Sequence, residues 1–151
     1  MVKNTGVFHL KRIDNNHGSL VPVEIMQDVP FDVRRIYYIF GVESGARRGF
    51  HSHRKLKQVL ICVHGCVTIH VRTPEDTDDI VLDDPAKALY IGPMVWREMY
   101  DFSPDATLLV LASEHYQESD YIRDYAQYEP EAKAYFDRPE NRAPMGEDCV
   151  R

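Results

Sequence analysis

The sequence contains no stretch that approaches the ~18 consecutive apolar residues of a membrane-spanning helix. Its first residues, MVKNTGVFHLKRID, also lack the apolar segment of a secretory signal peptide. These absences predict a protein that acts in the cytoplasm and has no membrane partner.

Cysteine is scarce as well, since the chain has only Cys62, Cys66 and Cys149. An odd number of cysteines in a chain without an export signal favours reduced thiols over a disulfide framework. Cys62 and Cys66 flank the tripeptide Val-His-Gly, and a turn there would place the two thiols on different strands. A metal site built from this Cys-x-His-x-Cys segment is therefore disfavoured.

Positive charge is in the minority. The 18 lysines and arginines are outnumbered by 24 aspartates and glutamates, and the resulting net charge of -6 argues against general nucleic-acid binding. Five of the cations nevertheless cluster between Arg47 and Lys57. This local cluster is compatible with an anionic small molecule as ligand.

Short β-branched and aromatic runs, separated by turn residues, dominate the sequence. They predict strands at 33–40, 59–63, 67–71, 80–82, 88–91 and 107–111. Helical periodicity occurs only late, at 119–128 and 130–138. Many short antiparallel strands favour an all-β barrel or a two-sheet jelly roll, because both protect strand edges. We expect this domain in residues 1–128, and a C-terminal helical extension and tail in 129–151.

The segment RRGFHSHRKLKQ, residues 47–58, holds the strongest candidates for chemistry. His51 and His53 share one face of a strand, because side chains alternate along it. Taken alone, the pair is open to three interpretations: a metal site, a proton-transfer site, or a charged strand edge in solvent.

Motif spacing decides among these interpretations. Gly45, His51, His53, Gln58 and Gly65 have the spacing of the first cupin motif, G-x5-H-x-H-x4-E-x6-G, and YIGPMVWREMYD resembles the second, with Arg97 in place of a ligand histidine. Gln58 is neutral where a carboxylate is usual, Arg97 is a permanent cation, and two imidazoles are too few for a catalytic metal. We therefore expect a cupin-type jelly roll without metal or cofactor, whose histidines are available for acid-base chemistry.

Four longer blocks resemble the dTDP-4-keto-6-deoxy-D-glucose 3,4-ketoisomerases of deoxyamino-sugar biosynthesis: IYYIFGVESGARRGFHSHRKLKQVLICVHG, LYIGPMVWREMYDFS, LLVLASEHY and ESDYIRDY. The resemblance covers about residues 5–126. It implies a homodimer that acts on a dTDP-linked 4-keto-6-deoxyhexose, in pathways that supply O-antigen, lipopolysaccharide or S-layer glycans.

The resemblance also implies roles for individual residues. Arg48-Gly49-Phe50-His51 is similar to the R-G-L-H of the related dTDP-sugar 3,5-epimerases, in which the histidine is the base and the arginine binds substrate. His51 is thus the expected general base, and Arg48 the expected pyrophosphate ligand. His53 is expected in the same pocket as a second acid-base or hydrogen-bonding group, with a purely structural histidine as the alternative.

Three further candidates complete the expected site. Tyr37 resembles an active-site tyrosine of the ketoisomerases, and we favour it over Tyr38 because neighbouring strand residues face opposite ways. Arg97 takes an inward-facing motif position, so it should reach the sugar or its oxyanion. His17, in the turn NNHGSL, is expected at the edge of the pocket.

The expected reaction is proton transfer beside a ketone. A ketone at C4 acidifies the hydrogen on C3, so a base whose pKa lies near neutrality suits the first step. Epimerisation at C3, or at C3 and C5, would begin in the same way, but the late-strand tyrosine motif of the epimerases is missing and the chain is shorter. A non-catalytic sugar-nucleotide-binding protein would need only residues 47–58 and Arg97. Both remain alternatives.

Overall fold

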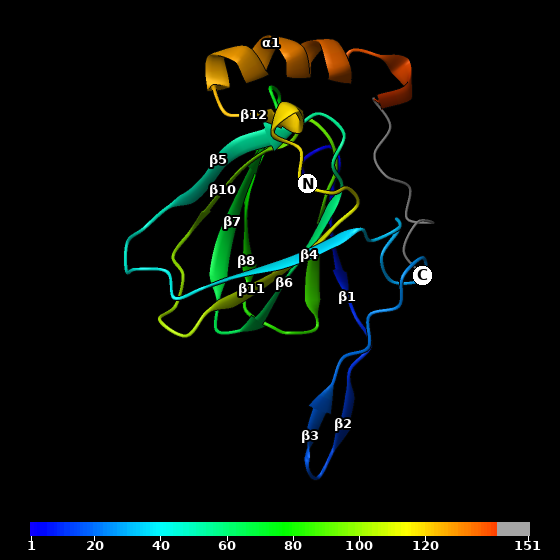
Figure 1. The fold of residues 1–151 in the computed structure, drawn as a ribbon, viewed down its shortest axis with the longest axis vertical. Helices are drawn as coiled ribbons and strands as arrows, with labels where there is room; N and C mark the ends of the chain where they lie inside the picture. Colours follow the sequence, from blue (N-terminus) through cyan, green and yellow to red (C-terminus); the bar gives the residue numbers. More distant parts are fainter. Residues whose placement is uncertain (142–151) are drawn as a thin grey trace.

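Two five-stranded antiparallel sheets pack against each other in the computed structural model, which describes residues 1–141 (Figure 1). The first sheet has the strand order β1-β9-β6-β11-β4, the second β12-β5-β10-β7-β8, and β2 and β3 form a separate hairpin. The strands are β1 (Thr5–His9), β2 (Ile13–Asn15), β3 (Gly18–Leu20), β4 (Arg35–Phe40), β5 (Arg48–His53), β6 (Gln58–His64), β7 (Val67–Arg72), β8 (Thr77–Leu82), β9 (Lys87–Ile91), β10 (Trp96–Tyr100), β11 (Thr107–Ala112) and β12 (Tyr121–Ile122). The all-β jelly-roll prediction is confirmed.

Alternating apolar side chains build the core between the sheets. In β7, Val67, Ile69 and Val71 are fully buried, whereas the residues between them are partly exposed. They pack with Leu60 of β6 and Val110 of β11 from the facing sheet. Burial of apolar surface of this kind is the main favourable contribution to folding.

β6 is buried on both faces over its first five residues, so it does not show the alternation expected from the sequence. Its second face, which includes Val59 and Ile61, is covered by Val29 and Phe31 from the connection before β4. A strand that is covered on both faces has a continuous run of apolar residues in its sequence.

The C-terminal helical segment expected from the sequence is present, but the stretches at 119–128 and 130–138 do not form two separate helices. The chain instead forms a short 3-10 helix (Glu118–Asp120), strand β12 and one helix, α1 (Tyr125–Phe136). Asp124 caps α1 by accepting a hydrogen bond from the amide of Ala126. Pro130 lies inside α1, although proline usually interrupts a helix because it lacks an N–H group.

Packing explains why α1 persists through Pro130. Tyr128, Ala132 and Phe136 form one buried face that contacts Met94 and Trp96 at the end of the sandwich (Figure 1). The helix thus runs unbroken across the domain boundary expected after residue 128.

A second 3-10 helix (Pro139–Asn141) follows, and the expected tail from residue 142 lies outside the described residues. None of the helices in residues 1–141 is long and apolar enough to span a membrane.

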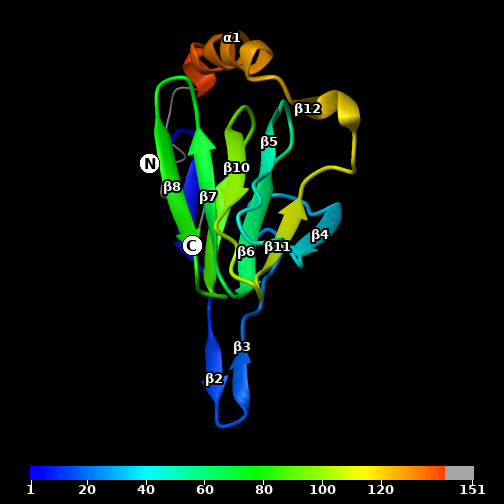
Figure 2. The same ribbon diagram turned by 90° about the vertical axis from the view of Figure 1, so that its left-hand side faces the viewer.

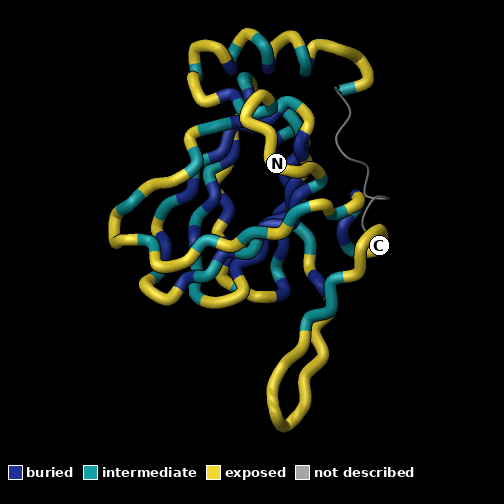
Figure 3. Tube along the Cα trace, viewed as in Figure 1, coloured by how far each residue is buried: buried dark blue, intermediate teal, exposed yellow. Residues whose placement is uncertain are grey.

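The β2–β3 hairpin projects away from both sheets (Figure 2). Every residue of the two strands is exposed, as the yellow loop in Figure 3 shows. The opposite end of the molecule carries α1 and β12 (Figure 1).

Candidate active site

A pocket of about 360 Å³ opens where β4, an edge strand of one sheet, faces β5 of the other. It is lined by Arg35, Ile36, Tyr37, Ile39, Arg48, Gly49, His51, Met99, Tyr121 and Arg123. Three of the residues selected from the sequence, Tyr37, Arg48 and His51, therefore lie in one pocket. Tyr38 points away and is 63% exposed, as strand alternation predicts.

A bulge in β5 brings Arg48 and His51 together. Arg97 of β10 pairs with His51, but the next residue of β10 pairs with Gly49, so Phe50 is left over as an extra residue. Gly49 has a φ of 93°, and a Cβ atom there would lie 2.9 Å from the carbonyl oxygen of Arg97. Only glycine fits this close approach of the two strands. Regular alternation would have sent Arg48 and His51 to opposite faces.

A chain of hydrogen bonds links the buried Arg97 to the pocket. Nη1 of Arg97 donates to Oε1 of Gln58 at 2.7 Å, and Nε2 of Gln58 donates to the phenol oxygen of Tyr37 at 2.9 Å. The orientation of Gln58 follows from Arg97, which can only donate. The phenol oxygen of Tyr37 is thus an acceptor toward Gln58, and its own O–H remains available to a ligand.

The phenol of Tyr37 is held neutral. Burial raises the pKa of Tyr37 above its usual value of 10, although the nearby Arg97 acts in the opposite direction. At neutral pH the group can therefore donate a hydrogen bond or a proton.

His51 is a weaker base than the sequence led us to expect. Burial and then the positive charge of Arg97 lower the pKa of His51 from 6.5 to about 3. Its Nδ1 is buried and makes no hydrogen bond. The expectation of a pKa near neutrality is corrected, because a local sequence pattern does not show how far a side chain is desolvated. The ring is nevertheless unprotonated at neutral pH and can accept a proton.

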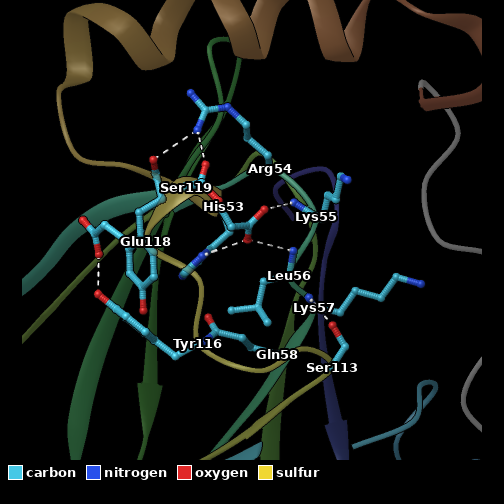
Figure 4. A network of polar contacts seen from close by, with 12 residues as sticks. His53, Arg54, Lys55, Leu56, Lys57, Gln58, Ser113, Tyr116, Glu118 and Ser119 are labelled. Carbon is cyan, nitrogen blue, oxygen red and sulfur yellow. Dashed lines mark hydrogen bonds and ion pairs between the residues drawn. The ribbon is translucent and has the colours of Figure 1, made fainter. Parts of the chain in front are cut away.

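His53, which was expected in the same pocket as His51, is not among the residues that line it. It lies deeper than His51, is only 1% exposed, and lines a second pocket together with Asp120. Its ring meets that of His51 edge to face, with 4.9 Å between the centroids, and it lies 4.2 Å from the ring of Tyr121. Nδ1 of His53 lies 3.3 Å from Oδ2 of Asp120, within ion-pair range but poorly aligned for a hydrogen bond (Figure 4). Burial lowers the pKa of His53 to about 4, against the raising effect of Asp120.

Arg97 is placed inside the sandwich, as expected, but it does not line the pocket. It is completely buried, and its second hydrogen bond goes from Nη2 to the carbonyl oxygen of Val95 at 2.9 Å. Burial lowers the pKa of Arg97 to about 10, so it remains a cation at neutral pH. Arg97 therefore acts on a ligand through its charge and through the hydrogen bonds that link it to Gln58 and Tyr37.

The structure does not bring His17 to the pocket of its own chain. His17 is exposed in the turn of the projecting β2–β3 hairpin, where its amide donates to the side chain of Asn15.

Cys62 is buried in β6, whereas Cys66 lies in the turn beyond that strand. Residues 1–141 contain no group of three or more histidines, cysteines or carboxylates that could hold a metal ion.

Sequence reasoning missed three pocket residues: Arg35, Tyr121 and Arg123. Arg35 stands two residues before Tyr37, so strand alternation could have placed it on the same face. Tyr121 and Arg123 lie within ESDYIRDY, one of the blocks that carry the family resemblance. With Arg48, the pocket lining contains three arginines, a composition suited to a pyrophosphate group.

Acid should destabilise the protein through His51 and His53. Their pKa values are about 3 and about 4 in the folded chain but near 6.5 when unfolded, so below about pH 6.5 the unfolded state binds more protons. Their contribution is complete above that pH, and each histidine should lose up to about 2 kcal/mol by about pH 5. Urea unfolding over this range measures the loss, and His51→Asn should reduce its slope. A parent protein equally stable throughout the range would contradict the lowered pKa values.

Comparison with known proteins assigns the family. Residues 3–133 match the family model described as FdtA: WxcM-like, C-terminal. The chain belongs to this FdtA family. The resemblance inferred from the sequence is thus confirmed, and the match extends into α1.

Several proteins similar to this chain are named for 3,4-ketoisomerase activity. The TDP-4-oxo-6-deoxy-alpha-D-glucose-3,4-oxoisomerase of Aneurinibacillus thermoaerophilus is 46% identical over 119 residues, which cover 79% of this chain and 86% of that protein. A mutant of the 3,4-ketoisomerase QdtA from Thermoanaerobacterium thermosaccharolyticum, in complex with TDP-4-keto-6-deoxyglucose, has a TM-score of 0.88 and 48% identity, covering 91% of this chain and all of that one. The TDP-quinovose 3,4-ketoisomerase WlaRB of Campylobacter jejuni has a TM-score of 0.81 and 42% identity, covering 84% and 98% of the two chains.

Proposed function

We propose that this protein is a sugar-nucleotide 3,4-ketoisomerase, which moves the ketone of a TDP-linked 4-keto-6-deoxyglucose from C4 to C3. The observation that carries the proposal is the pocket itself, in which an unprotonated histidine, a neutral tyrosine and three arginines converge. The named activities of the relatives at 46% and 48% identity support the same reaction.

The reaction begins with removal of the C3 proton by His51. The electrons of the C3–H bond form a C3=C4 double bond, and the carbonyl electron pair moves to O4. Tyr37, whose O–H is available, hydrogen-bonds the developing oxyanion, and the buried Arg97 offsets its charge through Gln58. Protonation of C4, balanced by release of the proton from His51, and transfer of the O3 proton to O4 then leave a ketone at C3 and a hydroxyl at C4. The negative charge of substrate and intermediate favours the protonated form of His51, which offsets part of its lowered pKa.

The arginines of the pocket bind the pyrophosphate. Arg48 is the residue expected from the sequence, and Arg35 and Arg123 add two cations on the same pocket. Arg35 is partly buried, with its Nε unpaired, and its guanidinium stacks over the rings of Tyr37 and Tyr116. A preorganised guanidinium of this kind gains charge-assisted hydrogen bonds with little loss of entropy.

NMR spectroscopy of the sugar product tests the proposed function. The protein is mixed with TDP-4-keto-6-deoxyglucose, and a ketone at C3 is expected. A 4-keto product inverted at C3, or at C3 and C5, would instead indicate an epimerase. Unchanged substrate that is bound by the protein would indicate a non-catalytic binding protein. The same spectra report the C4 configuration of the product, gluco or galacto.

Activity should survive removal of metal ions. Gln58 and Arg97 take the positions of a carboxylate and an imidazole ligand, and they are occupied in bonding to each other. Dialysis against a strong chelator should therefore leave the turnover rate unchanged. Loss of turnover that zinc, iron or manganese restores would contradict this prediction.

We propose a homodimer as the functional state. β4 is an edge strand, and Ile36, Tyr38 and Phe40 on its outer face are each more than 60% exposed. An exposed edge strand with apolar side chains is suited to association with the same surface of a second copy of the chain. The projecting β2–β3 hairpin could then carry His17 to the pocket of the other chain. Sedimentation velocity should give twice the chain mass, and a monomer would contradict the proposal.

The expected setting of the reaction is the cytoplasm. The 3-keto product is a substrate for an aminotransferase acting at C3, and the aminosugar would enter O-antigen, lipopolysaccharide or S-layer glycans.

A further inference from the structure

A partly buried carboxylate, that of Asp120, lies beside His53, and both residues line a second pocket of about 200 Å³. Oδ1 of Asp120 accepts a hydrogen bond from the amide of Lys55 at 2.9 Å, and Oδ2 accepts one from the amide of Leu56 at 3.3 Å. The same Oδ2 lies 3.3 Å from Nδ1 of His53 (Figure 4). Asp120 thus joins His53 to the chain that follows β5.

The position of Asp120 is fixed by the surrounding chain. Its carbonyl oxygen accepts a hydrogen bond from the amide of Arg54, and β12, which begins at the next residue, pairs with β5. The guanidinium of Arg54 donates to the carbonyl oxygens of Ser119 and Tyr121, and it is bound in turn by Glu131 of α1. The carboxylate is therefore held from both sides, and its side chain is only 15% exposed.

The contact between Asp120 and His53 has a chemical consequence for the imidazole. An ionised carboxylate can only accept a hydrogen bond, so its contact with an imidazole nitrogen is favourable when that nitrogen carries the proton. In a neutral imidazole the other nitrogen then has a free electron pair. For His53 the facing atom is Nδ1, which leaves Nε2 as the basic atom. The ring of His53 contacts that of His51, which lines the arginine-lined pocket, whereas His53 itself is not among the residues that line that pocket.

We propose that Asp120 is a positioning residue, which fixes the Nδ1–H tautomer of His53 and so presents Nε2 as the proton acceptor toward the sugar. The inference rests on the proposed ketoisomerase activity. A proton taken from a sugar hydroxyl at Nε2 forms an imidazolium, whose charge is offset by Asp120. Return of that proton to a sugar oxygen restores the neutral ring. His53 is then a shuttle, and Asp120 acts only through it.

The charges around the pair agree with this assignment. Burial alone would raise the pKa of Asp120, but His53 and the amides of Lys55 and Leu56 lower it, so the carboxylate is ionised at neutral pH. Without Asp120, the His53 imidazolium would face only unfavourable influences, namely burial and the cations of Arg97 and Arg35. Two further titratable groups, His51 and Tyr121, lie beside the ring of His53. The second pocket of about 200 Å³, which His53 and Asp120 line, also contains Lys55, Glu114 and His115.

Asp120→Asn tests the proposal because it changes the tautomer without changing the shape. When Oδ1 of the asparagine accepts the hydrogen bond from the amide of Lys55, the NH₂ group of the asparagine faces Nδ1 of His53. Because that group donates, the proton of the imidazole must then lie on Nε2. In an enzyme whose catalytic histidine is held by an aspartate, the same aspartate-to-asparagine change imposes the wrong tautomer and reduces turnover by about 10⁴-fold. We expect kcat to fall at least about 10²-fold with little change in KM. The ¹⁵N chemical shifts of His53, assigned by comparison with His53→Asn, should show the proton moving from Nδ1 to Nε2.

Glu131→Gln is the matched control. It also replaces a carboxylate by an amide and weakens the Arg54 contact that holds the same segment, but it leaves the His53 partner intact. It should retain kcat and the Nδ1–H tautomer, and Asp120→Glu should recover part of the lost rate. The proposal is overturned if Asp120→Asn leaves the tautomer unchanged, or if Glu131→Gln lowers kcat equally. The tautomer is measured without substrate, so a failure of the ketoisomerase assignment would appear separately, as a parent protein with the predicted tautomer and no 3-keto product.

Discussion

Replacing His51 with asparagine should abolish both isomerisation and exchange of the C3 hydrogen of the sugar in deuterated water. Asparagine has similar size and polarity, but it has no atom basic enough to accept the proton at neutral pH. A positioned base typically contributes 10²–10⁴-fold to a rate, so we expect turnover to fall by at least about 10²-fold. Hydrogen exchange followed by NMR isolates the first proton transfer from the later steps.

Binding of TDP should survive the same substitution. Arg35, Arg48 and Arg123 surround the pocket independently of His51, so the nucleotide and its pyrophosphate keep their contacts. Calorimetry with TDP should therefore give nearly the parental Kd. This separation of binding from chemistry distinguishes a missing base from a damaged pocket.

His64→Asn provides a control for the histidine substitution. His64 is the exposed last residue of β6, where it pairs with Asp105, and the variant should exchange the C3 hydrogen and turn over like the parent. The base would be misassigned if His51→Asn exchanged the C3 hydrogen at the parental rate. In that case the role would pass to whichever variant, His53→Asn or Tyr37→Phe, stops the exchange.

Arg97→Gln should reduce kcat/KM by about 10²-fold or more, because it removes a cation fixed close to the developing oxyanion. The protein should nevertheless remain folded. The guanidinium donates to two neutral oxygens, those of Gln58 and Val95, and burying a charge costs several kcal/mol that the variant no longer has to offset. Glutamine can still donate one hydrogen bond in its place. Steady-state kinetics and thermal unfolding test the two halves of the prediction.

The same variant has two further readouts. The pKa values of both His51 and His53 should rise, because Arg97 lowers them in the parent. The C4 configuration of the product should also be examined by NMR, since Arg97 lies beside the groups that handle the protons. Arg47→Gln, which removes an exposed arginine paired with Glu98, should behave like the parent. Parental rate, pKa values and stereochemistry in Arg97→Gln would show that Arg97 is only a structural residue.

The sequence alone was enough to predict the class of the fold and three residues, Tyr37, Arg48 and His51, that the structure brings to one pocket. Period-two alternation, as in β7, depends only on neighbouring residues and on which face is buried, so it is visible without a structure. The spacing that joins His51, His53 and Gln58 is likewise a local property. Alternation also explains why Tyr37 faces the pocket while Tyr38 does not.

Helix boundaries depended on tertiary contacts. The sequence around Pro130 predicts an interruption, and the single helix α1 forms because Tyr128, Ala132 and Phe136 are buried against the end of the sandwich. A packed face of this kind can outweigh local propensity.

The chemistry of the site was also decided by tertiary structure. The bulge at Phe50 turns Arg48 and His51 to the same pocket, and it requires β10 to approach Gly49 from 48 residues further along the chain. The lowered pKa of His51 requires burial and the charge of Arg97, and the contact of His53 with Asp120 requires β12 to pair with β5. Desolvation, electrostatic coupling and strand register all depend on residues distant in sequence. The residue types at the site could therefore be predicted from the chain, whereas their protonation states and orientations arise only when the two sheets and β12 come together.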